Sequence, residues 1–276
     1  MHLIERSRAI TASRLPRLII LTALAVLLGS VLLSSTVGPV RLTEAGLQQG
    51  GPGPQVLIGA DDDNVNNPTI QPPGVPVNQS LNNTDILVGG GGNDVLIGLL
   101  GNDVLLGGPG NDILIGGPEQ GTTPNSDLIF GGPGNDIAIW APGDGSDAFI
   151  GGPGLDALVF GVIDRDANNV PTLTGPVRGY PHGVPTANVS GQGGFCTVER
   201  PEDSSIGYEF LVRFFVRATG ALAVTIRVSE VEQVFCTSEA GGEITFADLT
   251  EENPQFVVVS LEEVAQLNRT VARIIR

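Results

Sequence analysis

Short apolar triplets recur through the middle of the chain, and each of them follows an aspartate. Asp94-Val95-Leu96-Ile97 and Asp112-Ile113-Leu114-Ile115 are two examples, and a glycine-rich stretch lies between successive triplets. Such a triplet predicts a short strand whose middle side chain points inward while its two neighbours point outward. The predicted inward residues are Leu87, Leu96, Leu105, Leu114, Ile129, Ala138, Phe149 and Leu158.

The triplets belong to a nonapeptide repeat. Three consecutive nine-residue units begin at Gly89, Gly98 and Gly107, and each contains Gly-Asn-Asp followed by apolar residues. Two later spacings are longer, but the flanking pattern is retained, so we interpret 116–126 and 140–146 as loop insertions. The repeat aspartates are Asp85, Asp94, Asp103, Asp112, Asp127, Asp136, Asp147 and Asp156.

The two halves of each unit have different physical roles. The glycines supply the turn conformations with positive φ that other residues adopt only at a cost. One apolar triplet buries little surface, so stability must come from stacking the units into a continuous core. A disordered acidic linker is the alternative, but a linker has no reason to place an apolar residue two positions after every repeat aspartate.

The pattern Gly-Gly-x-Gly-x-Asp-x-apolar-x resembles the RTX, or hemolysin-type, calcium-binding repeat over residues 83–160, and more loosely over 50–63. The resemblance implies an all-β fold, in which two nonapeptides complete one turn of a right-handed parallel β-roll. It also implies several Ca²⁺ ions between glycine loops on the same side of the roll. The implied ligands are the side chains of all eight repeat aspartates and the backbone carbonyls of Gly89, Gly91, Gly107, Gly131 and Gly151. The implied aspartate pairs are 85 with 103, 94 with 112, 103 with 127, 112 with 136, 127 with 147, and 136 with 156.

Several units depart from the repeat pattern. Leu99 stands where the second glycine of the Asp103 unit is expected, and the Asp127 and Asp147 units carry the insertions. Upstream, Gln55 replaces the aspartate of the unit 50–58, which predicts a metal-free starter coil. For Asp61-Asp62-Asp63, a solvated acidic loop is a simpler interpretation than an independent cation site.

Charge supports the assignment to calcium. The net charge is −16, the chain contains no lysine, and no arginine occurs between Arg41 and Arg165. Carboxylates on stacked coils about 4.8 Å apart would repel by roughly 3–4 kcal/mol at an effective dielectric near 20. A hard divalent cation with oxygen ligands reverses that repulsion, and the repeats offer no thiolate or imidazole for zinc or copper. Nucleic acid is excluded as a partner of this acidic block.

The N-terminal residues 1–37 predict an export signal or an uncleaved membrane anchor. Four arginines precede an apolar run at 18–33, and small polar residues follow it. The remainder is predicted to be secreted or at the cell surface, with membrane contact only if the segment stays uncleaved. The predicted order continues with a linker at 38–49, the roll at 50–161, a linker at 162–194 and a β domain at 195–276.

The C-terminal third predicts a small antiparallel β domain that caps the roll. Alternating apolar residues on both sides of Ala218-Thr219-Gly220 predict a β-hairpin. Further strands are predicted at 231–237, 244–246, 255–260 and 270–275, with a short helix at 261–267.

Two cysteines, Cys196 and Cys236, each lie in a Phe-Cys-Thr triplet. In an oxidising compartment a disulfide is the simplest interpretation, and two buried thiols are the alternative.

No catalytic motif is recognisable in the sequence. His182 lies in a predicted surface turn, and a Gly-x-Ser-x-Gly nucleophile elbow does not occur. The pairs Glu251/Glu252 and Glu262/Glu263 fall where solvated loop or helix faces are predicted. We therefore predict a calcium-stabilised structural or adhesive protein with a cell-surface or matrix partner, and no enzyme. The alternative is a secreted RTX-type hydrolase, or an accessory subunit, with an unrecognised active site in the C-terminal domain.

Overall fold

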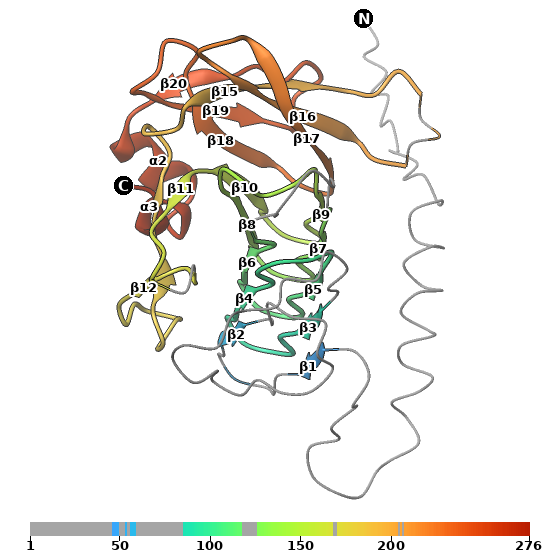
Figure 1. The fold of residues 1–276 in the computed structure, drawn as a ribbon, viewed down its shortest axis with the longest axis vertical. Helices are drawn as coiled ribbons and strands as arrows, with labels where there is room; N and C mark the ends of the chain where they lie inside the picture. Colours follow the sequence, from blue (N-terminus) through green and yellow to red (C-terminus); the bar gives the residue numbers. More distant parts are fainter. Residues whose placement is uncertain are drawn as a thin grey trace, which may run out of the picture. The chain divides into compact units, whose positions relative to one another are not determined.

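Two eight-stranded sheets dominate the fold (Figure 1). The computed structural model describes residues 46–49, 53, 56–58, 85–117, 126–167, 170–203, 205 and 207–276. The export segment predicted at 1–37 and the acidic triplet at 61–63 lie outside the described residues. All described strands and helices belong to one unit, formed by 42–203 and 208–276.

Parallel strands from successive repeats alternate between the two sheets. Sheet A contains β1 (Gly46–Gln49), β3 (Asp85–Val88), β5 (Val104–Leu106), β7 (Leu128–Phe130) and β9 (Ala148–Ile150). Sheet B contains β2 (Val56–Ile58), β4 (Val95–Ile97), β6 (Ile113–Ile115), β8 (Ile137–Trp140) and β10 (Ala157–Phe160). Because each strand pairs with the strand two repeats away, two nonapeptides complete one turn, and the predicted parallel β-roll is confirmed.

The core of the roll lies between the two sheets. Pairing is in register, so Leu87 lies opposite Leu105 and Leu96 lies opposite Leu114. All eight predicted inward residues belong to one apolar cluster, and none is more than 3% exposed. The middle residue of each triplet therefore faces the interior, as the alternation along a strand requires.

The C-terminal strands extend the same two sheets. In sheet A, β17 (Ala221–Ser229) pairs parallel with β9, and β16 (Phe210–Val216) and β15 (Gly194–Glu199) then add antiparallel. In sheet B, β18 (Gln233–Thr237) pairs parallel with β10, and β19 (Ile244–Asp248) and β20 (Val257–Val259) follow antiparallel. The predicted hairpin is present as β16 and β17, and it continues the roll directly.

The core of the roll also continues into these strands. Trp140 and Phe160 lie at the end of the repeats, and their rings pack against each other and against Phe214 of β16. The disulfide expected between Cys196 and Cys236 is present, and it links β15 of sheet A to β18 of sheet B. Both cysteines are buried in the same apolar cluster as the repeat leucines.

The two stretches predicted as linkers contain strands. β1 lies within 38–49, and 162–194 contains β11 (Val162–Ile163), β12 (Leu173–Thr174), β13 (Val184–Pro185) and β14 (Ala187–Asn188). Tyr180 and Val184 belong to the apolar cluster that covers the outer face of sheet B. Prolines interrupt this stretch, so no alternating pattern marked its two-residue strands.

Two short helices complete the covering of sheet B. α2 (Leu261–Leu267) has the predicted bounds, but 270–275 is not a strand because α3 (Val271–Ile274) occupies it. Val271 and Ile274 are both buried, one helical turn apart, and Asn268 Oδ1 accepts the N–H groups of Thr270 and Val271. Packing therefore overrides the β-branched composition. No helix among the described residues has the length and apolar character needed to span a membrane.

Candidate metal centre

The roll has two edges, at which the chain turns from one sheet to the other. Turns from sheet A to sheet B are 89–94, 107–112, 131–136 and 151–156, and we call them the regular edge because all keep the repeat glycines. Turns from sheet B to sheet A are 98–103, 116–127 and 141–147, and we call them the irregular edge. Leu99 and both insertions lie on the irregular edge, so among these seven turns the departures from the repeat pattern are confined to one edge.

On the regular edge, successive aspartates form a hydrogen-bonded ladder. The N–H of Asp94 donates to Asp112 Oδ1, that of Asp112 to Asp136 Oδ1, and that of Asp136 to Asp156 Oδ1, each over 2.7 Å. Asparagines form a parallel ladder, because Asn93 Oδ1 accepts the N–H of Asn111. The ladder fixes one oxygen of Asp112, Asp136 and Asp156 and leaves the other for a different partner.

The irregular edge carries the corresponding ladder. Asp85, Asp103 and Asp127 donate their N–H groups to the Oδ1 atoms of Asp103, Asp127 and Asp147 over 2.7–2.9 Å. All six aspartate pairs implied by the repeat are thus neighbours, and each of the eight aspartates is at most 5% exposed.

The second oxygen of the regular-edge carboxylates faces a space that only glycine leaves open. The Oδ2 atoms of Asp112, Asp136 and Asp156 are buried and have no hydrogen-bond partner. A Cβ added to Gly131 would lie within 2.7 Å of both Asp136 Oδ2 and the carbonyl oxygen of Gly151. The missing side chain therefore leaves a cradle bounded by oxygens from two successive turns.

The same cradle repeats along the regular edge. At Gly89 the added Cβ would lie 2.5 Å from Asp94 Oδ2 and 2.6 Å from the Gly107 carbonyl, and at Gly107 it would meet Asp112 and the Gly131 carbonyl. Calcium takes carboxylate and backbone carbonyl oxygens as ligands, so the kind of donor found here suits it. The predicted carbonyls of Gly107, Gly131 and Gly151 face cradles. For those of Gly89 and Gly91, the described residues show no such arrangement.

Burial of the regular-edge aspartates disfavours their ionisation. It raises the pKa of Asp112 to about 7, that of Asp136 to about 8 and that of Asp156 to about 7, and neighbouring carboxylates add to the effect. Burial penalises the charged form of a carboxyl group, and a nearby negative charge does the same. A cation held in the cradles would remove both penalties.

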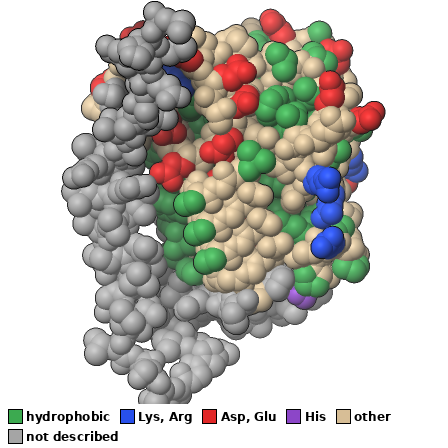
Figure 2. Space-filling model, turned by 180° about the vertical axis from the view of Figure 1, so that it is seen from behind, with side chains coloured by type: hydrophobic (Ala, Val, Ile, Leu, Met, Phe, Trp, Pro, Cys, Tyr) green, Lys and Arg blue, Asp and Glu red, His purple; other side chains and the backbone are tan. Residues whose placement is uncertain are grey.

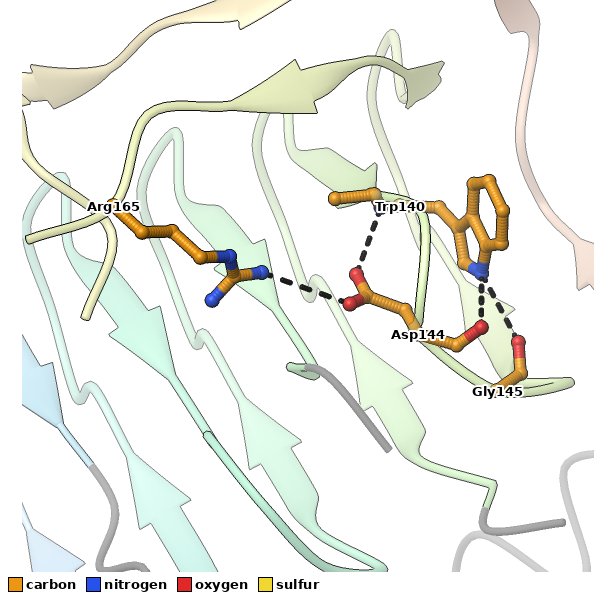
Figure 3. Close-up of polar contacts among 5 residues, drawn as sticks. Trp140, Asp144, Gly145 and Arg165 are labelled. Atoms are coloured by element: carbon orange, nitrogen blue, oxygen red, sulfur yellow. Dashed lines mark hydrogen bonds and ion pairs between the residues drawn. The ribbon is translucent and has the colours of Figure 1, made fainter. Parts of the chain in front are cut away.

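On the irregular edge, an arginine supplies the positive charge at the smaller insertion. Figure 3 shows the buried carboxylate of Asp144 between Arg165 and the turn that begins at Trp140. Arg165 Nη2 lies 3.7 Å from Asp144 Oδ1, while Asp144 Oδ2 accepts the N–H of Ala141. The Trp140 indole N–H donates to the carbonyls of Asp144 and Gly145, which fixes the turn (Figure 3).

A second arginine lies beside the same turn. Arg227 donates to the carbonyl of Ser146 over 2.6 Å, and its charge lowers the pKa of Asp147, although burial raises that pKa overall to about 6. In contrast, Asp112, Asp136 and Asp156 form no ion pair within the described residues. Most of the arginines visible in Figure 2 lie together at one border of that face, away from most of its acidic side chains.

The cradles do not resemble a site built from side chains alone. In the part of the chain that the structure describes, no three His, Cys, Asp or Glu side chains are grouped so that they could hold a metal ion. A cation at the regular edge would use backbone carbonyls in addition to carboxylates, as hard cations accept.

Stacked glycine turns with buried carboxylates define a parallel β-roll whose edge is suited to hard cations. Residues 81–118 and 123–138 match the model of the RTX calcium-binding nonapeptide repeat, in four copies. The chain thus contains RTX repeats, as the resemblance predicted. No curated protein and no solved structure is significantly similar to the chain. The ladder extends past the matched residues to Asp156.

The other residues that the sequence singled out lie away from the cradles. His182 is exposed in a turn, as predicted, and both glutamate pairs are exposed. Glu263 caps α2, because its side chain accepts the N–H of Ser260. Asp144 and Arg165 were missed as a pair. The Pro-Gly-Asp-Gly turn at 142–145 marks Asp144, but no sequence pattern connects it to Arg165.

Proposed function

We propose that this protein binds several Ca²⁺ ions along the regular edge and that binding stabilises the roll. The RTX match and the β-roll fit a calcium-binding protein. The observation that carries the proposal is the repeated pair of oxygens, one buried Oδ2 and one glycine carbonyl, around each glycine cradle. The ligand groups are the carboxylates of Asp94, Asp112, Asp136 and Asp156 and the carbonyls of Gly107, Gly131 and Gly151.

Electrostatics explains why the ion would matter for folding. Each stacked carboxylate pair costs roughly 3–4 kcal/mol in mutual repulsion at an effective dielectric near 20. The core of each coil is only a few apolar side chains, so repulsion between ionised carboxylates on several coils opposes it strongly. Calcium converts each repulsive contact into a favourable one and couples its binding to folding. Magnesium fits less well, because it retains its waters and requires near-octahedral geometry.

We further propose a structural or adhesive role for the protein after export to the cell surface. The basic and apolar order of residues 1–37 supports export, and a disulfide suits an oxidising compartment. Calcium affinity of about 10⁻⁴ to 10⁻³ M is typical of extracellular modules. Retention of the protein on washed cells, and its release by a chelator, would support this role. Its presence only in the cytosolic fraction would contradict it.

The direct test is a titration of the full chain followed by far-UV circular dichroism. We expect strand signal to increase with Ca²⁺ at about 10⁻⁴ to 10⁻³ M, and equal Mg²⁺ to have little effect. Identical spectra in excess chelator and in saturating Ca²⁺ would contradict the proposal.

A further inference from the structure

The regular edge contains one more turn, which lies outside the repeats. After β9 and β10, the next strands of the two sheets are β17 and β18, and Glu230-Val231-Glu232 connects them. This connection contains neither glycine nor aspartate, so the repeat pattern does not reveal it. Strand pairing places Ser229 opposite Ile150 and Gln233 opposite Ala157, which aligns Glu230 with Gly151 and Glu232 with Asp156.

The hydrogen bonds of this turn repeat those of the glycine turns. Glu232 Oε2 accepts the N–H of Asp156 over 2.7 Å, as Asp156 Oδ1 accepts that of Asp136. The Glu230 carbonyl accepts the N–H of Gly152, as the Gly151 carbonyl accepts that of Gly132. Glu232 therefore occupies the next position of the aspartate ladder.

The last cradle has the same oxygen lining as those before it. A Cβ added to Gly151 would lie 2.6 Å from Asp156 Oδ2 and closer still to the Glu230 carbonyl. Asp156 is fully buried and its Oδ2 has no hydrogen-bond partner, so a buried carboxyl oxygen is directed into this cradle without a polar partner. A buried oxygen in that state needs a partner, and a bound cation is one that would satisfy it.

The turn is shorter than a glycine turn and strained to fit. Three residues, Glu230 to Glu232, replace the six of 151–156, and Glu230 adopts φ 53°, in the left-handed region. A glutamate reaches one carbon further than an aspartate, which compensates for the shorter backbone. Glu209 Oε2 accepts the N–H of Glu230, so a third carboxylate lies beside the turn.

We propose that Asp156, Glu232 and the Glu230 carbonyl form a terminal Ca²⁺ site that joins the roll to the C-terminal strands. This inference rests on the proposed function, and it extends calcium binding beyond the repeats to a segment with no repeat sequence. The ion at this position would bridge β10 and its preceding turn to the connection between β17 and β18. Calcium would thereby couple the C-terminal strands to the roll.

The test is a count of bound Ca²⁺ by native mass spectrometry on the full chain, taken from the folded charge states only. We expect Glu232→Gln to bind one ion fewer than the unmodified protein. Glu262→Gln is the control, because it removes the same charge from an exposed position on α2, outside the site. It is expected to bind the full number.

Each result of this count bears on either the terminal site or the proposed function. Equal counts in all three proteins, or the same loss in both variants, would overturn the terminal site, while a wild-type protein that binds several ions would leave the proposed function intact. A wild-type protein that binds none would instead remove the proposed function. If Glu232→Gln does not fold, a crystal structure of the wild-type protein with Ca²⁺ decides. An ion between Asp156 and Glu232 supports the site, and ions confined to earlier turns overturn it.

Discussion

At each regular-edge aspartate, the two carboxylate oxygens have different partners. In Asp112, Asp136 and Asp156, Oδ1 accepts a backbone N–H from the preceding turn, whereas Oδ2 faces a glycine cradle and the carbonyl of the following turn. Glycine is required at the cradle for space, because any Cβ would occupy the position between those oxygens. Each repeat therefore creates a binding position both through its aspartate and through a glycine that has no side chain.

Filling one cradle should weaken calcium binding. Gly107→Ala places a methyl group against Asp112 Oδ2 and the Gly131 carbonyl, while Gly193→Ala adds the same group where nothing lies within 4 Å. Overpacking typically costs about 1–3 kcal/mol. We expect the calcium midpoint of Gly107→Ala to rise about tenfold, or about 1.4 kcal/mol. That of Gly193→Ala should stay unchanged, and equal midpoints would show that the cradle is not the site.

The stability of the metal-free protein should fall as pH rises. In the folded state the pKa of Asp112, Asp136 and Asp156 is raised from 3.8 to about 7, 8 and 7. Between about pH 4 and pH 8 the folded state therefore holds more protons than the unfolded state, so raising the pH favours unfolding. In metal-free buffer we expect a higher thermal midpoint at pH 5 than at pH 8.

Saturating calcium provides the control for this pH series. Because protons compete with the ion for the carboxylates, the calcium-loaded protein should be less stable at pH 5 than at pH 8. A metal-free thermal midpoint that is constant or increases from pH 5 to pH 8 would contradict the assignment of buried, uncompensated aspartates.

Among the elements, the three-residue strands are stable only through stacking. Leu105 is fully buried between the sheets, whereas Leu222, on β17, is 49% exposed. Leu105→Ala should lower the free energy of unfolding in calcium by about 2–5 kcal/mol. Leu222→Ala should change it by no more than about 0.5 kcal/mol. Denaturant unfolding measures both, and similar values for the two variants would contradict a core centred between the sheets.

The elements also show which features a sequence pattern reveals. The repeat strands and aspartate pairs were predictable, because spacing of nine residues fixes both the register and the side that each residue faces. The parallel pairing of β9 with β17 was not, since residues far apart in sequence form it. For the same reason the position of Glu232 depends on the sheets, because nothing in the Glu-Val-Glu turn resembles the repeat.

In the molecule as a whole, both sheets continue from the repeat strands into strands that lack the repeat. Sheet B is covered on its outer face by 162–194 and by α2 and α3, and the disulfide links the two sheets beyond the repeats. The apolar residues of 162–194 lie in short stretches without periodicity, so the sequence of this segment predicted a linker. The C-terminal strands thus have a disulfide and a large aromatic core, whereas the repeats depend on stacked, acidic turns.

Hydrogen exchange of the full chain, with and without calcium, distinguishes a calcium-dependent roll from one that is stable alone, because it reports stability region by region. We expect amides in 85–117 and 126–160 to be protected in saturating Ca²⁺ and to exchange rapidly in its absence, while those of β15 to β19 change less. Equal protection of the repeat amides in both conditions would show that the roll is stable without calcium, so that calcium binding is not coupled to its folding.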